Sequence, residues 1–233
     1  MQRKENPTLG MVIPCYNEES MMPRLIEELK VFAGRLGFPC RFLFVDDGSR
    51  DRTADLMFEV CEQDTQFAFL SFSRNFGHQT AVSAGLQFIE GDVVAVIDAD
   101  LQDPPEVILE MLELWKQGYD VIYGVRRDRK EHAFLRVAYK LFYRLLERIS
   151  NIEIPPDAGD FSLMDRKVVD HINRLPEHNR FVRGLRSWVG FRQIDFPYQR
   201  ARRQAGATKY DFFRLTQLAF DGLISFSSIP LRL

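Results

Sequence analysis

The chain of 233 residues contains only three cysteines, Cys15, Cys40 and Cys61, and no C-x-x-C pair. An odd number of cysteines without that spacing argues against both a disulfide framework and a zinc site. We therefore expect all three thiols to be reduced. The first eight residues also lack the apolar stretch of a secretory signal, so none is predicted.

Long hydrophobic runs and two common nucleotide-binding signatures are also missing. No run of about 18 uncharged apolar residues is present, so the sequence predicts no membrane-spanning helix. No G-x-G-x-x-G follows the first predicted strand, and no G-x-x-x-x-G-K-[ST] occurs anywhere. These absences argue against a nicotinamide-cofactor enzyme and a P-loop nucleotidase.

Charge is unevenly distributed along the chain, although the net charge is only -2. Residues 1–120 carry 10 basic and 21 acidic side chains, whereas residues 121–233 carry 21 basic and 12 acidic ones. An acidic first part suits a bound cation, and a basic second part suits phosphates or an anionic membrane surface.

Apolar segments of strand character alternate with segments of helical periodicity through the first half of the chain. We expect strands at 9–13, 41–45, 67–72, 93–97 and 120–124, and helices that end near Leu36, Cys61, Phe88 and Gln117. This alternation predicts an α/β fold with a mostly parallel central sheet flanked by helices. In such sheets, ligands bind at the carboxyl ends of the strands.

Three of the predicted strands are followed at once by oxygen-rich polar residues. Pro14 to Glu18 follow the first strand, Asp46-Asp47 follow the second, and Asp98 to Asp100 follow the fourth. One such end is ordinary, but three at the same edge of a sheet predict a binding site.

Asp98 and Asp100 are two residues apart, so in an extended segment their carboxylates would point to the same side. That arrangement suits Mg²⁺ or Mn²⁺, because hard cations prefer carboxylate oxygen. The alternative is an acidic turn before the helix that begins at Pro104.

Six stretches of the chain carry a resemblance to a known family. VIPCYNEE, FVDDGSRDRT, SRNFGHQTAVSAGL and VIDADLQDPPE, in this order, resemble the family 2 glycosyltransferases of the GT-A fold. GDFSLMDRKVVD and RARRQAGATKYDFFRL narrow the resemblance to the dolichyl- and polyprenyl-phosphate hexosyltransferases, which include bactoprenol glucosyltransferase-like enzymes. The resemblance spans residues 9–233. No Q-x-x-R-W is present, which argues against a processive polysaccharide synthase.

The resemblance implies a metal-dependent, inverting transfer of a hexose-type sugar from a nucleotide-sugar to polyprenyl phosphate. UDP-glucose is the first candidate for the donor. It implies a donor site that consists of Pro14, Tyr16, Glu18, Val45, Asp47, Asp98, Ala99 and Gln102. Asp98 and Asp100 are the implied ligands of Mg²⁺ or Mn²⁺. Arg126, Arg203 and Lys209 match phosphate-binding positions, and the implied catalytic residues are Asp100, Asp160 and Arg126.

Several of these positions keep an alternative interpretation. Asp160 matches an acidic position near the acceptor, where it could act as general base, orient the acceptor or serve as a structural carboxylate. One of Asp46 and Asp47 is expected to do no more than stabilise a loop or cap a helix. The four histidines, His78, His132, His171 and His178, show no metal-ligand spacing, and both tryptophans, Trp115 and Trp188, fit core positions. Arg74, Asn75 and Gly77 are interpreted as helix entry and packing.

Residues 1–210 are expected to form the catalytic domain, and residues 211–233 an amphipathic juxtamembrane segment. Residues 131–150 combine an apolar side with a basic stripe, which fits either an interfacial helix on anionic lipid or a core-packed helix. Many relatives continue past this end into two membrane-spanning helices, so we interpret the chain as a short form or a trimmed catalytic domain.

The expected partners are a nucleotide-sugar, a polyprenyl-phosphate acceptor and the cytoplasmic face of a membrane. A homo-oligomer is a further option, and no nucleic acid is expected. Two other hypotheses remain open from the sequence. The same fold could act on a soluble or protein-bound glycan, or the chain could be a non-catalytic nucleotide-sugar-binding module.

Overall fold

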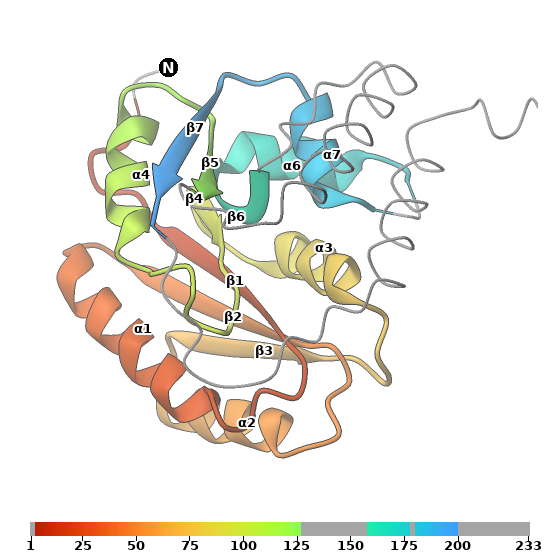
Figure 1. Cartoon of the computed structure of the whole chain (residues 1–233). Coiled ribbons are helices and arrows are strands. Elements are labelled where there is room, and N and C mark those ends of the chain that lie inside the picture. Colours follow the sequence, from red (N-terminus) through yellow and green to blue (C-terminus); the bar gives the residue numbers. More distant parts are fainter. Residues whose placement is uncertain (1–2, 127–157, 178–179, 200–233) are drawn as a thin grey trace, which may run out of the picture.

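The computed structural model describes residues 3–126, 158–177 and 180–199. One seven-stranded sheet in the order β3-β2-β1-β4-β6-β5-β7 forms its centre (Figure 1). The strands are β1 (Leu9–Cys15), β2 (Cys40–Asp46), β3 (Phe67–Ser71), β4 (Val93–Val96), β5 (Val121–Arg126), β6 (Ala158–Asp165) and β7 (Gln193–Tyr198). The helices are α1 (Met22–Leu36), α2 (Thr53–Gln63), α3 (His78–Phe88), α4 (Val107–Lys116), α6 (Arg166–Arg174) and α7 (Val182–Trp188). The predicted α/β fold with a mostly parallel sheet is confirmed.

Strand β6 runs against the direction that the other described strands share. It pairs antiparallel with β4 on one side and with β5 on the other. Because of this reversal, the start of β6 lies at the edge where β4 ends, which is the carboxyl edge of the parallel strands. Asp160, near the start of β6, is thereby brought to the same edge as the predicted D-x-D motif.

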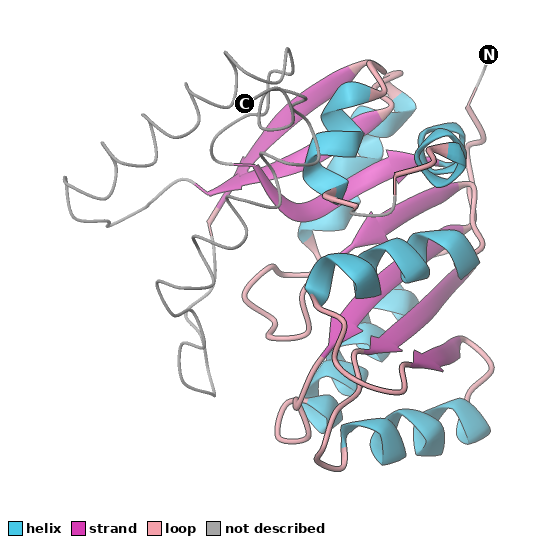
Figure 2. Ribbon diagram, turned by 90° about the vertical axis from the view of Figure 1, so that its right-hand side faces the viewer, coloured by secondary structure: helices cyan, strands magenta, loops and turns pink. Residues whose placement is uncertain are grey.

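Helices cover both faces of the sheet, as Figure 2 shows from the side. Helices α1, α2 and α4 pack on one face, against β1 residues such as Met11 and Ile13. Helices α3, α6 and α7 pack on the other face, against Val12 and residues of β2 and β4. The two faces alternate along β1 because successive side chains of a strand point to opposite sides. Strands β1 and β4 contain no charged residue and are buried along their whole length.

The two tryptophans differ from each other, and the prediction for one of them is wrong. Trp115 is 3% exposed, and its indole Nε1 donates a hydrogen bond to Asp165 at 2.8 Å, as a core position requires. Trp188 is 54% exposed. Helix α7 buries Val182 and Leu185, whereas Trp188 is its last residue and lies beyond the buried part of the helix.

The described part of the chain contains no helix that is long and apolar enough to cross a membrane. The three cysteines are free thiols, as predicted. The segment 131–150, the tail 211–233, Arg203 and Lys209 lie outside the described residues.

Close packing of α3 on β1 leads to a stability prediction. A Cβ atom on Gly85 of α3 would come within 2.1 Å of Val12 Cγ1, whereas one on Gly34 of α1 would meet no atom within 4 Å. We expect Gly85→Ala to lower the free energy of unfolding by about 1–3 kcal/mol through overpacking. Gly34→Ala, the matched control, should raise it by up to about 1 kcal/mol through helix propensity. Urea denaturation of both variants measures this, and a Gly85→Ala variant as stable as the parent would contradict the packing.

Candidate active site at the carboxyl edge of the sheet

The three polar strand ends meet at one edge, as the sequence predicts. Strands β1, β2 and β4 are parallel neighbours, with Cys15 opposite Asp46 and Pro14 opposite Val45. The amide of Asp47 continues this pairing by donating to the carbonyl of Cys15 at 2.9 Å. Residues that follow these strands therefore project from adjacent positions.

Reciprocal hydrogen bonds join the loop after β1 to the loop after β2. The amide of Asn17 donates to Ser49 Oγ at 2.9 Å, and the amide of Arg50 donates to Asn17 Oδ1 at 2.8 Å. The amide of Glu18 donates to Thr53 Oγ1 at 2.8 Å. Asn17 adopts a left-handed φ of 53°, which an asparagine tolerates better than most residues. The two loops are thus held as one unit, with Tyr16 and Glu18 partly buried beside them.

Asp46 and Asp47 are both buried, and their carboxylates stabilise different loops. Asp46 accepts from the Ser49 amide at 3.0 Å and from Ser71 Oγ at 2.8 Å, which is the loop role expected for one member of the pair.

Asp47 accepts from the Phe76 amide at 2.7 Å, the Gly77 amide at 2.9 Å and Asn75 Nδ2 at 2.8 Å. Burial raises the pKa of Asp47, although these amides oppose the shift. Both carboxylate oxygens of Asp47 are thus engaged by the loop before α3.

The D-x-D motif lies in a turn and not, as the sequence suggested, in an extended segment. Strand β4 ends at Val96, Ala99 and Asp100 lie in a turn, and Leu101 adopts a left-handed φ of 53°. Asp100 Oδ1 accepts from the Gln102 amide at 3.1 Å. This local hydrogen bond between an aspartate and the amide two residues on favours a turn over continued strand.

Crowding of carboxylates at the D-x-D motif fits a cation. Burial raises the pKa of Asp98, and Asp103, Asp160 and Asp100 raise it further, whereas His78 lowers it. The Asp98 side chain is 31% exposed, so it remains accessible. The described residues contain no group of three His, Cys, Asp or Glu side chains with metal-binding geometry.

Four hydrogen bonds from three side chains occupy the carboxylate of Asp160. Arg183 binds it with both ends of its fork, Nε to Oδ1 at 2.8 Å and Nη2 to Oδ2 at 2.8 Å. Gln79 Nε2 donates to Oδ2 at 3.1 Å, and His78 Nε2 lies 3.1 Å from the same oxygen. Burial would raise the pKa of Asp160, but the charge of Arg183 and the hydrogen bond from His78 hold it well below its usual range. Asp160 is therefore an ionised and fully paired carboxylate.

His78, the first residue of α3, lies between the two acidic parts of the site. Its Nε2 atom is 3.1 Å from Asp160 Oδ2 and 3.9 Å from Asp98 Oδ1, and 43% of its side chain is exposed. Burial lowers the pKa of His78, but the hydrogen bond to Asp160 and the charges of Asp160 and Asp98 raise it overall. The ring connects the D-x-D carboxylate to the Asp160 group.

A buried guanidinium lies behind this group. Arg186 of α7 is 2% exposed, its Nη1 donates to the carbonyl of Gly159 at 3.2 Å, and its guanidinium lies 5.2 Å from the ring centre of Tyr123. Burial lowers the pKa of Arg186 to about 10, so the side chain stays charged at neutral pH. Its charge adds to that of Arg183 on this side of the site.

Most site residues named from the sequence are brought together, and three others were missed. Arg126 ends β5, where its backbone pairs with Tyr198. The sequence analysis gave no site role to His78, Gln79 or Arg183. Their places in the helices could have identified them. His78 and Gln79 are the first two residues of α3, which begins at the carboxyl edge, and Arg183 is the second residue of α7.

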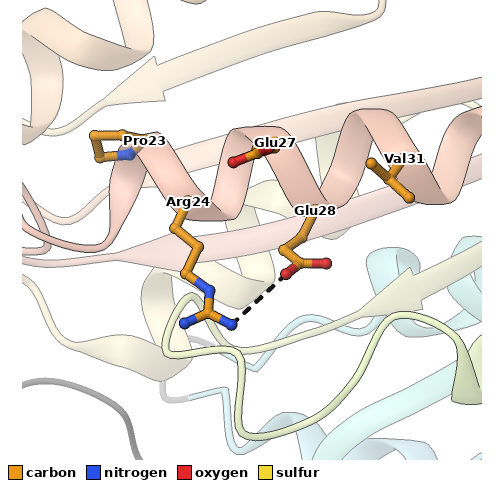
Figure 3. Close-up of a pocket in the computed structure, with 5 residues that line it drawn as sticks. All are labelled: Pro23, Arg24, Glu27, Glu28 and Val31. Atoms are coloured by element: carbon orange, nitrogen blue, oxygen red, sulfur yellow. Dashed lines mark ion pairs between the residues drawn. The ribbon is translucent and has the colours of Figure 1, made fainter.

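A separate hollow of about 500 Å³ lies on the outer side of α1 (Figure 3). Its lining consists of Pro23, Arg24, Glu27, Glu28 and Val31. Because one helix supplies all of these residues, the hollow is open, and it shares none of its lining with the groups described above.

Comparisons with known proteins identify the family of the chain. The family model described as "Glycosyl transferase family 2" matches residues 11–172. The chain is 48% identical over 225 residues to "Uncharacterized glycosyltransferase YkcC" of Bacillus subtilis, covering 96% of this chain and 70% of that protein. It is 39% identical over 226 residues to "Prophage bactoprenol glucosyl transferase homolog" of Escherichia coli, covering 97% and 74% respectively.

A solved structure with a similar fold is a mannosyltransferase from Pyrobaculum calidifontis in complex with GDP-Man and Mn²⁺. It superposes with a TM-score of 0.63 at 15% identity and covers 98% of this chain and 65% of that one. At this identity the likeness concerns the fold alone. The predicted GT-A architecture is confirmed.

The pairing of Asp160 predicts a pH-dependent contribution to stability. Asp160→Asn removes one charge of a buried pair, which should cost roughly 3 kcal/mol at pH 7, the lower end of the range because Arg183 is 24% exposed. Since the folded pKa of Asp160 lies below its unfolded value of about 4, the stabilisation is complete above that pH and is lost as the pH falls through the folded pKa.

Urea denaturation of the parent chain and the variant at pH 7 and at about pH 3 measures this difference. The difference in the free energy of unfolding between the parent chain and Asp160→Asn should be smaller at the lower pH. Asp195→Asn, on the exposed part of β7, is the control and should leave stability nearly unchanged. An equal difference in the free energy of unfolding at both pH values would contradict an ionised Asp160.

Proposed function

Because this chain belongs to glycosyl transferase family 2, we propose that it is a glycosyltransferase that moves a hexose-type sugar from a nucleotide-sugar to polyprenyl phosphate. UDP-glucose is the first candidate donor. The relative named as a bactoprenol glucosyl transferase homolog supports both the sugar and the lipid carrier. The acceptor assignment also has support from the chemistry of the site.

The observation that carries the acceptor assignment is the state of Asp160. A hydroxyl acceptor needs a general base that can accept its proton, and such a base works best with a pKa near the operating pH. Asp160 already accepts from Arg183, Gln79 and His78, and its pKa is depressed. A phosphate monoester needs no such base, because with a second pKa near 6 it is largely dianionic at neutral pH.

The transfer balances without a proton acceptor in the protein. An oxygen of the dianionic acceptor phosphate attacks the anomeric carbon and forms a new C–O bond. The bond from that carbon to the donor diphosphate breaks, and its electron pair leaves with the nucleoside diphosphate. Attack on the face opposite the leaving group inverts the anomeric configuration.

Asp98 and Asp100 would hold Mg²⁺ or Mn²⁺, which as a Lewis acid neutralises charge that develops on the departing diphosphate. The chain itself positions these carboxylates. The Gln102 amide donates a hydrogen bond to Asp100, and the turn at Ala99 and Asp100 sets the direction of the backbone between the two aspartates. Pro14, Tyr16, Glu18, Val45 and Asp47 would surround the nucleoside, and the adjacent ends of β1 and β2 support this assignment.

The remaining predicted residues extend the proposal to phosphates and membrane. Arg126, Arg203 and Lys209 would bind phosphate groups, which suits the basic character of residues 121–233. The segments 131–150 and 211–233 would lie on the cytoplasmic face of a membrane, where a polyprenyl phosphate presents its head group.

A screen of nucleotide-sugar donors tests the proposal. UDP-glucose is tried first, then GDP-mannose and other UDP-sugars, and the release of nucleoside diphosphate is measured. Each donor is mixed with polyprenyl phosphate or with the same polyprenol lacking phosphate. We expect release of one nucleoside diphosphate with the phosphate only. Transfer to the alcohol, to a soluble glycan or to a protein would contradict the proposed acceptor, and donor binding without any transfer would favour a non-catalytic module.

Loss of the metal ligand should stop turnover. Asp100→Ala should lower kcat about 100-fold or more, because charge on the leaving group is no longer neutralised. Asp55→Ala, an exposed carboxylate on α2, is the matched control and should keep full activity. Chelation with EDTA should abolish parent activity, and added Mn²⁺ or Mg²⁺ should restore it. Activity that survives chelation would contradict the metal assignment.

A further inference from the structure

We infer that His78 contacts the acceptor phosphate and that Gln79 and Arg183 are positioning residues that hold His78 in place through Asp160. This inference rests on the proposed function and names the side chains that recognise the acceptor head group. It concerns residues to which the sequence gave no role in the site.

The location of His78 is the first argument. Its Nε2 atom lies 3.9 Å from Asp98, on the side of the donor and metal, and 3.1 Å from Asp160, on the side of the acceptor. Reacting atoms must approach to roughly 3–3.5 Å, so the phosphate oxygen has to arrive between these two parts of the site. His78 occupies that boundary.

The accessibility of His78 is the second argument. Although it touches two carboxylates, 43% of its side chain is exposed, compared with 5% for Asp160. Within the described residues, Nε2 is the ring atom engaged by the carboxylates, and Nδ1 makes no hydrogen bond. Nδ1 is therefore the ring atom that can meet a phosphate oxygen while Nε2 faces Asp160.

Charge at this edge is the third argument. Asp98, Asp100, Asp103 and Asp160 would together repel an anionic acceptor. Arg183 pairs with Asp160 through both carboxylate oxygens, and the buried Arg186 lies close behind it. The charge of Asp160 is thereby balanced, so a phosphate that approaches His78 meets a carboxylate that is already paired with a guanidinium.

Gln79 and Arg183 fix this arrangement from two helices. Gln79 donates to Asp160 Oδ2 at 3.1 Å and accepts from the Val182 amide at 2.9 Å, so it joins the start of α3 to the start of α7. Arg183 fixes the plane of the same carboxylate with its two-point contact. Gln79 and Arg183 therefore both hold Asp160 Oδ2, the oxygen that orients His78.

The test measures acceptor and donor affinity separately in the full chain. Farnesyl phosphate is the acceptor probe, titrated in the presence of Mn²⁺ and UDP so that no turnover is needed. UDP with Mn²⁺ is the donor probe. Steady-state KM and kcat with polyprenyl phosphate and UDP-glucose complement the two binding constants. Thermal unfolding reports whether each variant folds.

His78→Ala should raise the Kd for farnesyl phosphate about 10-fold, the value of one charge-assisted hydrogen bond, and change the Kd for UDP by less than about 2-fold. His78→Gln should recover part of the loss, because its amide can still donate. His171→Ala, on the exposed side of α6, is the matched control and should change neither constant.

Arg183→Ala should raise the KM for polyprenyl phosphate and lower kcat, whereas Arg183→Lys should recover part of both. Lysine keeps the charge but loses the two-point contact. Arg174→Ala, an exposed arginine of α6, serves as the control. A purely structural role of Arg183 would lower the thermal stability and leave the acceptor KM of the folded protein unchanged.

The inference is overturned if the parent chain does not bind farnesyl phosphate, or if folded His78→Ala binds it as the parent does. Equal weakening of acceptor and donor binding would also overturn it. Failure of the proposed function has a different signature, since the parent chain would then transfer sugar to no polyprenyl phosphate at all. Parent transfer combined with unchanged acceptor binding in His78→Ala would refute the inference alone.

Discussion

The two-point ion pair between Asp160 and Arg183 is the interaction on which the organisation of the site depends. It joins β6 to α7, and Gln79 adds α3 through its bonds to Asp160 and to the Val182 amide. A buried carboxylate with these partners is ionised and has little capacity left to accept a proton. The arrangement makes Asp160 a fixed structural charge that orients His78, beside which we propose that the acceptor binds.

The reversed strand explains how the site acquires two different halves. Strands β1, β2 and β4 end at the carboxyl edge and supply the loops of the proposed donor side, including the D-x-D turn. Strand β6 runs the other way, so it contributes the beginning of a strand to the same edge. Carboxylates gathered near Asp98 suit a metal and a diphosphate, whereas the paired carboxylate of Asp160 suits an acceptor that already carries its own negative charge.

Local sequence patterns predicted the first five strands and four helices, because apolar periodicity and polar strand ends are local signals. They did not predict β6 and β7. Strand β6 is buried on both faces but includes the polar residues Asp160 and Ser162, so it lacks the continuous apolar run expected of a central strand. The sequence kept the turn at Ala99–Leu101 only as the alternative to an extended segment, because a single local hydrogen bond to Asp100 decides between the two. His78 and Arg183 could not be paired with Asp160 from sequence, because that contact forms only when α3, β6 and α7 meet in the fold.

A crystal structure with UDP, Mn²⁺ and farnesyl phosphate bound tests the central claim most directly, namely that Asp160 orders the acceptor side without acting as a base. The account predicts that both Asp160–Arg183 hydrogen bonds persist and that a phosphate oxygen lies within hydrogen-bond distance of His78. It also predicts the metal at Asp100. A structure in which Asp160 leaves Arg183 and contacts the attacking oxygen of the acceptor would contradict it.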